Sequence, residues 1–293
     1  MNTQLATKAL HAGHDSANSQ GTQAVPIYQT TSYVFKDSEH AANLFSLAEP
    51  GFIYTRLNNP TNDVLEQRLA ALEGGVAAVA TASGTAAIAT TLMVILKNGD
   101  HIVASSSLYG GTYNLLANTL PRFGITTTFV DPDSPEEFSK AVQPNTRAFF
   151  AESLGNPKLD VLDLKVISEK AQAAKVPFIV DNTVASPALL NPIEYGANIV
   201  IHSLTKYLTG NGTSLGGIII DAGTFNWANG LFPEFTEPNP SYHGLNYHEA
   251  LGAIAFIAKV RIEGLRDLGS APSPFNSFQT IQGIETLDIR MKK

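Results

Sequence analysis

Residues 177–207, PFIVDNTVASPALLNPIEYGANIVIHSLTKY, decide the fold class of this chain. They contain two apolar runs, PFIVD (177–181) and NIVIHS (198–203), separated by a segment in which a helix fits. The centres of the runs, FIV (178–180) and IVI (199–201), are apolar and do not alternate with polar residues. Such strands suit a parallel sheet that is buried on both faces, because helices cover each side of it. The stretch therefore predicts two strands of an α/β sheet.

The same pattern extends along the chain on both sides of this stretch. Leu65, Leu69 and Leu72 fall on one helical face, and Leu164 and Ile167 begin a second series with helical spacing. We therefore predict an α/β fold with a mostly parallel central sheet flanked by helices. The further candidate strands are VAAVA (76–80), HIVAS (101–105), TTTFV (126–130), RAFFAE (147–152) and GIII (217–220).

The composition is that of a globular protein with a sizeable core, since 44% of the 293 residues are hydrophobic and 15% are charged. A net charge of −7 argues against a nucleic-acid partner. The absence of cysteine excludes disulfides and thiolate metal sites, and it fits a cytoplasmic location. Residues 74–96 are uncharged, but their small and hydroxylated side chains favour a strand, a turn and a buried helix. No membrane partner is expected.

Three parts are predicted along the chain. Residues 1–53 are polar and irregular, and we expect them to form an extended arm that lies on another domain or subunit. Residues 54–247 contain the candidate strands. Residues 248–293 are predicted to form a connecting helix and the start of an incomplete C-terminal domain, because the final IETLDIRMKK looks helical and ends in mid-element.

In parallel sheets ligands bind beyond the carboxyl ends of the strands, so the residues there are candidates for chemistry. Gly84 and Thr85 follow the first strand and open a helix, where free backbone N–H groups can bind an anion. An ordinary strand–helix turn is the alternative. Asp181 ends PFIVD and could face a cationic ring nitrogen, or it could simply form an Asx turn.

Lys206 lies three residues beyond Ser203 and is either a surface lysine or the amine of a Schiff base. Ser203 and Thr205 offer two hydroxyls to an anion beside it. Tyr109, after the second strand, is a core aromatic or stacks on a planar ring. Ser203–Lys206 also matches S-x-x-K of serine acyl-enzymes, but S-D-N and K-T-G are absent. His248 begins an incomplete H-E-x-x-H, so no metal site is predicted.

Six ordered motifs together resemble the Cys/Met-metabolism family of pyridoxal-phosphate enzymes, which has fold type I. This resemblance extends over essentially the whole chain and implies a fold type I transferase. Residues 54–247 would then be the cofactor-binding catalytic domain. The motifs are YTRLNNPT (54–61), ASGTAA (82–87), LYGGTYNLL (108–116), ESLGNP (152–157), VDNT (180–183) and HSLTKYLTGN (202–211).

The resemblance implies roles for particular residues. Lys206, Asp181 and Tyr109 would be the catalytic residues. Lys206 would hold pyridoxal phosphate as a Schiff base and move protons. Asp181 would keep the pyridine nitrogen protonated, and Tyr109 would stack on the ring. Asn156 would lie beside the ring hydroxyl and the substrate.

The cofactor phosphate would have two sets of ligands. Gly84 and Thr85 would bind it through backbone N–H groups, and Ser203 and Thr205 through hydroxyls. In this family Tyr54 and Arg56 reach the phosphate of the neighbouring subunit, so a homodimer is the minimum and a homotetramer is favoured. Arginine suits this role because its fork binds phosphate oxygens in pairs.

Within the family, the segments 225–247 and 268–291 resemble O-acetylhomoserine sulfhydrylases. The resemblance implies replacement of the acetyl group of O-acetylhomoserine by sulfide, which gives homocysteine and acetate. Cystathionine γ-synthase activity, or methionine or cystathionine γ-lyase activity, is the alternative. A further C-terminal domain, with an arginine for the substrate carboxylate, is usual in the family and is expected to be truncated here.

Overall fold

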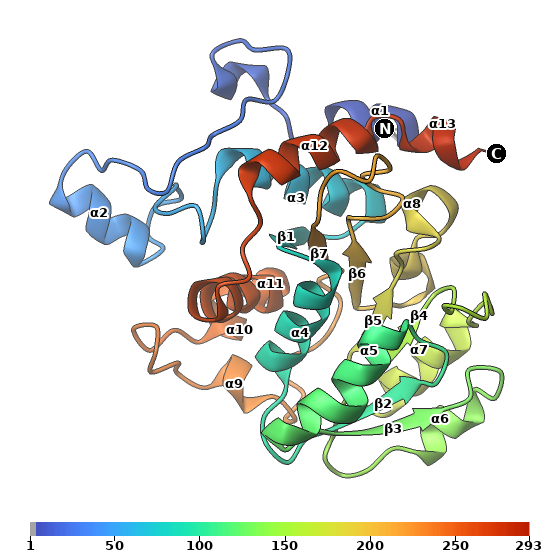
Figure 1. Cartoon of the computed structure of the whole chain (residues 1–293). Coiled ribbons are helices and arrows are strands. Elements are labelled where there is room, and N and C mark those ends of the chain that lie inside the picture. Colours follow the sequence, from blue (N-terminus) through green and yellow to red (C-terminus); the bar gives the residue numbers. More distant parts are fainter. Residues whose placement is uncertain (1–3, 293) are drawn as a thin grey trace.

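A seven-stranded sheet forms the centre of the computed structural model, which describes residues 4–292 (Figure 1). The strand order is β1-β7-β6-β5-β4-β2-β3. Each of the seven runs expected from the sequence forms one of these strands, with ends that differ by at most one residue. The strands are β1 (Ala77–Thr81), β2 (His101–Ser105), β3 (Thr126–Val130), β4 (Thr146–Glu152), β5 (Phe178–Asp181), β6 (Ile199–Ser203) and β7 (Gly217–Asp221).

The sheet is mostly parallel, as predicted. Only β7 runs against its neighbours, and it pairs antiparallel with both β1 and β6. In this register Gly217 lies opposite Thr81 on one side and Ser203 on the other. The carboxyl ends of β1 and β6 therefore lie at the same edge of the sheet, on either side of the start of β7.

Helices cover both faces of the sheet, so neighbouring residues of one strand enter different cores. Phe149 packs in the core beneath α3 and α7, whereas Phe150 packs in the core beneath α4 and α11. Each is fully buried, which contributes about 1.5–3 kcal/mol per side chain. The larger helices are α3 (Pro60–Glu73), α4 (Gly84–Ile95), α7 (Leu164–Ala173) and α12 (Pro274–Ile284).

Helix α3 illustrates why the sequence folds this way locally. The Asn59 side chain accepts a hydrogen bond from the Thr61 N–H at 2.9 Å, and Pro60 occupies the first helical position. Gly74 ends the helix with a φ of 80°, a left-handed conformation that glycine adopts without strain. The helix begins and ends where its capping residues require.

The N-terminal residues contain two short helices that the sequence did not lead us to expect. Helix α1 (Leu5–His11) packs against α3 and α13 (Leu287–Met291). Helix α2 (Ser38–Phe45) stands away from the sheet (Figure 1). Residues 24–35, by contrast, form no helix, in line with the extended arm predicted for residues 1–53.

The remaining elements are short. None of the helices within residues 4–292 is both long enough and apolar enough to cross a membrane. All seven strands lie within 54–247, but the three predicted domain boundaries stay predictions.

The remaining α-helices are α5 (Gly110–Asn114), α6 (Glu136–Lys140), α8 (Ser186–Leu189), α9 (Pro233–Thr236), α10 (Tyr247–Leu251) and α11 (Ala255–Lys259). The 3-10 helices are Ser16–Ser19, Leu120–Phe123, Pro192–Tyr195 and Gly252–Ile254, and the π-helices are Leu115–Thr119 and Val260–Leu268.

Candidate functional site

A cavity of about 780 Å³ lies at the carboxyl edge of the sheet. This is the edge that the strand order predicts for a ligand in a parallel α/β fold. The cavity brings together eight of the residues expected from the sequence, which come from five separate segments. They are Gly84, Thr85, Tyr109, Asn156, Asp181, Ser203, Thr205 and Lys206.

The start of α4 rests directly on the end of β6. A Cβ atom added to Gly84 would lie 2.7 Å from the Cβ of Ser203, which is closer than real side chains approach. Ser83 caps the helix, because its hydroxyl accepts a hydrogen bond from the Ala86 N–H at 3.1 Å. The first N–H groups of a helix have no partner within it and favour an anion. Glycine at position 84 thus places an anion site beside the Ser203 hydroxyl.

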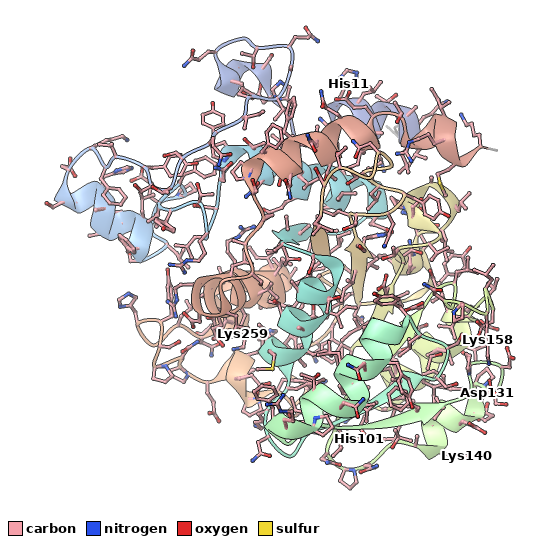
Figure 2. The ribbon with its side chains drawn as sticks, in the orientation of Figure 1. His11, His101, Asp131, Lys140, Lys158 and Lys259 are labelled. Carbon is pink, nitrogen blue, oxygen red and sulfur yellow. The ribbon has the colours of Figure 1, made fainter. Side chains whose placement is uncertain are left out.

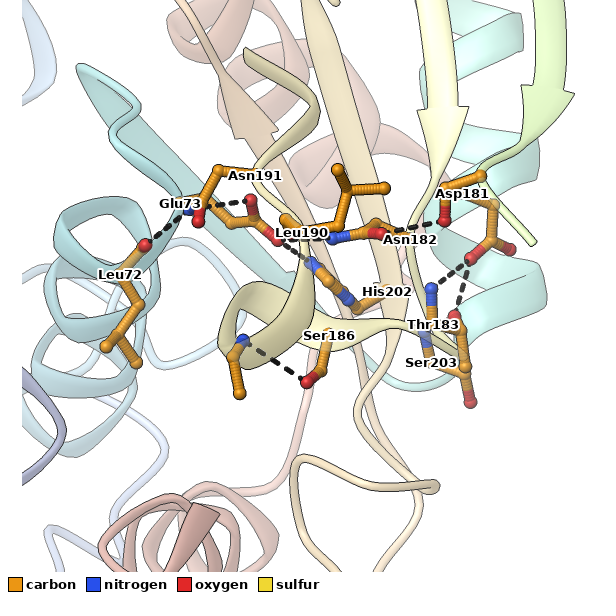
Figure 3. A network of polar contacts seen from close by, with 12 residues as sticks. Leu72, Glu73, Asp181, Asn182, Thr183, Ser186, Leu190, Asn191, His202 and Ser203 are labelled. Atoms are coloured by element: carbon orange, nitrogen blue, oxygen red, sulfur yellow. Dashed lines mark hydrogen bonds and ion pairs between the residues drawn. The ribbon is translucent and has the colours of Figure 1, made fainter. Parts of the chain in front are cut away.

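Asp181 is held in place at the end of β5 by Thr183 (Figure 3). Asp181 Oδ1 accepts hydrogen bonds from the Thr183 N–H, at 3.0 Å, and from the Thr183 hydroxyl. The same hydroxyl accepts a bond from the Ser203 N–H at 2.8 Å. Burial raises the pKa of the Asp181 carboxyl above its usual value, and the two bonds from Thr183 oppose this in part. A cation in the cavity would relieve the cost of that buried charge.

A buried polar network lies behind Asp181, on the opposite face of the sheet (Figure 3). Glu73, at the end of α3, accepts hydrogen bonds from His202 at 2.6 Å and from Asn182 at 3.0 Å. Glu73 and His202 are fully buried. Because His202 precedes Ser203 and Asn182 follows Asp181, one carboxylate fixes the ends of two strands. The sequence did not lead us to this network, since Glu73 and His202 are 129 residues apart.

Lys206 lies in the turn that follows β6, and its side chain is exposed to the cavity. Its N–H donates to the Ser203 carbonyl at 3.3 Å, and its own carbonyl accepts from the Gly210 N–H at 2.8 Å. Nζ forms no ion pair with any residue that the structure describes. The Thr205 hydroxyl, which is predicted to bind an anion, is hydrogen-bonded to the backbone of Gly216.

Glu152, the last residue of β4, also lines the cavity, and the sequence did not single it out. Its Oε1 accepts from the Tyr109 N–H at 2.7 Å, and its Oε2 accepts from the Asn156 N–H at 3.1 Å. Burial, together with the nearby charge of Asp181, raises the pKa of Glu152 to about 8. The only signal in the sequence was a carboxylate at a strand end, in the motif ESLGNP.

Tyr54 and Arg56 do not line the cavity. Tyr54 is 40% exposed, and the Arg56 guanidinium lies 5.3 Å from the centre of its ring. Arg56 also donates a hydrogen bond to the Arg266 carbonyl. The structure thus keeps these two residues apart from the other eight within one chain.

The part of the chain that the structure describes contains no cluster of three side chains able to hold a metal ion. His11, on α1, and His101, at the start of β2, lie at opposite ends of the molecule (Figure 2). The cavity itself is lined by a lysine, by carboxylates and by N–H and O–H donors.

This donor set fits pyridoxal phosphate. The start of α4 suits a phosphate, Asp181 suits a protonated ring nitrogen, and Tyr109 offers an aromatic face. The exposed amine of Lys206 opens into the same cavity. A volume of about 780 Å³ is in the range of small-molecule sites. The individual roles of these residues stay predictions.

A family model described as Cys/Met metabolism PLP-dependent enzyme matches residues 6–293. The chain belongs to this family. Among its members, an O-acetyl-L-homoserine sulfhydrylase of Leptospira meyeri is 59% identical, over 98% of this chain and 67% of that protein. A homocysteine synthase of Schizosaccharomyces pombe is 50% identical, over 98% of this chain and 68% of that protein. The chain thus spans about two thirds of the length of these relatives.

A solved structure from Campylobacter jejuni gives the same result. It is described as an O-acetylhomoserine (thiol)-lyase with N'-pyridoxyl-lysine-5'-monophosphate, and it is 42% identical to this chain with a TM-score of 0.95. The match covers 98% of this chain and 72% of that one. The prediction of a fold type I enzyme of this family is confirmed.

Proposed function

We propose that this chain uses pyridoxal phosphate to replace the acetyl group of O-acetyl-L-homoserine with sulfide, which yields homocysteine and acetate. One observation carries the proposal. The cavity brings Lys206, Asp181 and the start of α4 together at one sheet edge. Relatives at 48–59% identity that bear the names O-acetyl-L-homoserine sulfhydrylase and homocysteine synthase support the choice of substrates.

When bound, pyridoxal phosphate supplies an aldehyde for the amino group of the substrate and a ring that accepts electrons from its carbon atoms. Lys206 would hold this group through Nζ and would move protons at the substrate carbons. Asp181 would keep the ring nitrogen protonated. Tyr109 would stack on the ring, and Asn156 would bind near the ring hydroxyl and the substrate.

Two N–H groups and two hydroxyls would hold the phosphate. Gly84 and Thr85 donate from the backbone at the start of α4, where the helix dipole favours a negative charge. Ser203 and Thr205 donate from their side chains. For Thr205 this requires the hydroxyl to exchange its bond to the Gly216 carbonyl, at 3.4 Å, for one to the phosphate.

The proposal includes a homodimer as the minimum and a homotetramer as the complete assembly. Support comes from Tyr54 and Arg56, which lie outside the cavity of their own chain. They would complete the phosphate site of a neighbour. The cytoplasm is the proposed location, because the substrates are small metabolites and the chain has no cysteine for disulfides.

Borohydride reduction tests the proposal. The chain is incubated with pyridoxal phosphate, reduced and digested, and the peptide masses are measured. A pyridoxyl phosphate group on Lys206 is expected, and it should be absent from Lys206→Ala. The surface variant Lys165→Ala serves as the matched control and should retain the group. Modification spread over surface lysines, without preference for Lys206, would contradict the assignment.

A product assay tests the substrates. O-acetylhomoserine is supplied with sulfide, with cysteine, or with neither. Homocysteine formed only in the presence of sulfide supports the proposal. Cystathionine formed from cysteine would indicate a γ-synthase instead, and 2-oxobutyrate formed from cystathionine or methionine would indicate a γ-lyase.

A further inference from the structure

One carboxylate joins two of the loops that form the cavity. Glu152 ends β4, and its two oxygens are used separately: Oε1 accepts from the Tyr109 N–H at 2.7 Å and Oε2 accepts from the Asn156 N–H at 3.1 Å. Tyr109 belongs to the loop after β2, and Asn156 to the loop after β4. Both donors are backbone groups, so Glu152 holds the backbone of Tyr109 and of Asn156 in place. This contact does not depend on the side chains of these two residues.

The position of the Tyr109 ring depends on this contact. The ring is 52% exposed, so little packing holds it from the solvent side. On the other side it rests against Gly111, where an added Cβ would lie 2.5 Å from the ring carbon Cε1. The ring is therefore fixed by the space at Gly111 and by the hydrogen bond at its own N–H.

A second link between the same loops does not involve the side chain of Glu152. The Ser107 hydroxyl donates to Asp160 Oδ1 at 2.6 Å, and the Gly155 N–H donates to the Asp160 carbonyl at 2.9 Å. This link keeps the two loops together if Glu152 is changed. Substitution of Glu152 should therefore shift the cavity-lining residues without unfolding the loops.

The negative charges around Glu152 are not balanced by any side chain that the structure describes. Asp181 lies beside it on β5, where the two residues are register partners, and Asp160 adds a further negative charge. The titratable groups that line the cavity with Glu152 are Tyr109, Asp181, Lys206, Tyr207 and Arg290. None of the described cations forms an ion pair with Glu152. A buried carboxylate without a cationic partner costs stability, so packing alone does not explain it.

We propose that Glu152 is a positioning residue that sets Tyr109 and Asn156 against the cofactor. The inference rests on the proposed function, because it assumes pyridoxal phosphate in the cavity. Glu152 contributes through the two N–H groups that it holds, and the bound cation of the ring offsets its charge together with that of Asp181.

The test compares the full chain with Glu152→Gln and Glu152→Ala, and with Glu169→Gln on the exposed face of α7 as the matched control. We measure the dissociation constant of pyridoxal phosphate by fluorescence quenching of Trp227, the dichroism of the bound cofactor, and the melting temperature of the ligand-free chain at pH 9. Two lost hydrogen bonds predict that the dissociation constant rises about tenfold or more in Glu152→Ala and less in Glu152→Gln. The circular dichroism band of the bound cofactor should decrease in intensity, because the Tyr109 ring would no longer stack on the cofactor ring in a fixed orientation.

Stability separates positioning from a merely structural role. Removal of a charge beside Asp181 should leave the melting temperature at pH 9 within about 3 °C of the wild type, or above it. Affinity that falls only together with this melting temperature would overturn the inference. A combination with Tyr109→Ala adds a second criterion: the loss of affinity caused by Glu152→Gln should be smaller in that background.

Two failures can be distinguished. If the wild-type chain does not bind pyridoxal phosphate, the proposed function fails and this inference fails with it. If the wild type binds and both Glu152 variants bind equally well with an unchanged dichroism band, only the role of Glu152 is wrong.

Discussion

At the scale of single residues, buried carboxylates decide how stability depends on pH. Asp221 ends β7 at the edge of the sheet opposite the cavity, and it is 2% exposed. One of its oxygens accepts from the Gly223 N–H at 2.8 Å, and Oδ2 has no partner among the described residues. Burial raises its pKa to about 7. Between the pKa of the unfolded chain and pH 7 the folded state holds a proton that the unfolded state has lost, so stability falls as pH rises.

Asp221→Asn should therefore stabilise the chain, most of all above pH 7. The amide keeps the bond from Gly223 and removes the charge. The raised pKa corresponds to a gain of up to about 4 kcal/mol at pH 8 and about two fifths of that at pH 5. Urea unfolding at the two pH values measures it, with exposed Asp133→Asn as the control. A gain that is equal at both pH values would show that the charge of Asp221 is not its cause.

Asp181→Asn should have different effects on the stability of the ligand-free chain and on its affinity for pyridoxal phosphate. Burial raises the pKa of Asp181, so its charge destabilises the folded chain above the usual pKa range of aspartate. Without ligand, the variant should be at least as stable as the wild type in urea at pH 8. Its affinity for pyridoxal phosphate should fall about 10- to 100-fold, because a charge-assisted hydrogen bond is lost. Equal affinity of the two chains would remove Asp181 from the cofactor site.

At the scale of elements, the contact between α4 and β6 should control the phosphate site. Gly84→Ala would place a Cβ 2.7 Å from the Ser203 Cβ, so the start of α4 has to move away from β6. We expect about tenfold weaker binding of pyridoxal phosphate and a loss of about 1–3 kcal/mol in stability, as in other overpacked sites. Calorimetric titration and urea unfolding measure the two effects.

Gly110→Ala is a closely matched control for this change. Gly110 also opens a helix, α5, but nothing lies within 4 Å of its added Cβ. Alanine is the better helix former, so the stability of this variant should hold or rise. If both glycine variants lose affinity alike, the contact with Ser203 is not what matters.

Elements that depend on local sequence could be predicted, and contacts between distant segments could not. All seven strands were predicted within one residue because each run is rich in apolar or β-branched residues. The reversed direction of β7 depends on its pairing with β6 and with β1, and β1 lies about 140 residues earlier. Helices α1 and α2 escaped prediction because they are only seven and eight residues long, and α1 is held by packing on α3.

The residues of the candidate site fall into the same two groups. Residues at or just after a strand end, such as Asp181 and Lys206, could be predicted, because the carboxyl ends of parallel strands lie at one edge of the sheet. Glu152 could not, since its contacts are to backbone N–H groups, one of them 43 residues away. The bond between Glu73 and His202 forms only once α3 lies on the sheet.

At the scale of the whole molecule, a single chain exposes apolar side chains to solvent, and two predicted phosphate ligands lie outside its cavity. Val34 is 97% exposed, and Phe45 and Leu47 are about half exposed, in the segment that stands away from the sheet (Figure 1). Tyr54 and Arg56 follow that segment in the sequence. In a dimer, each arm could reach the neighbouring chain. This contact would cover the exposed apolar side chains of the arm, and it would bring Tyr54 and Arg56 to the cavity of the partner.

Mixing two inactive variants tests whether the site is shared between chains. Lys206→Ala lacks the lysine of its own cavity, and Arg56→Ala is predicted to lack a phosphate ligand in the cavity of its partner. In a mixed dimer, the cavity formed by Lys206 of one chain and Arg56 of the other is intact. At equal amounts with random exchange, about half of the Lys206 residues should then bind pyridoxal phosphate with wild-type affinity, because half of the Arg56→Ala chains have a Lys206→Ala partner. Borohydride reduction at limiting cofactor, followed by peptide mass analysis, measures this fraction. If mixing leaves the fraction at the level of Arg56→Ala alone while sedimentation shows mixed dimers, Arg56 acts within its own chain or not at all.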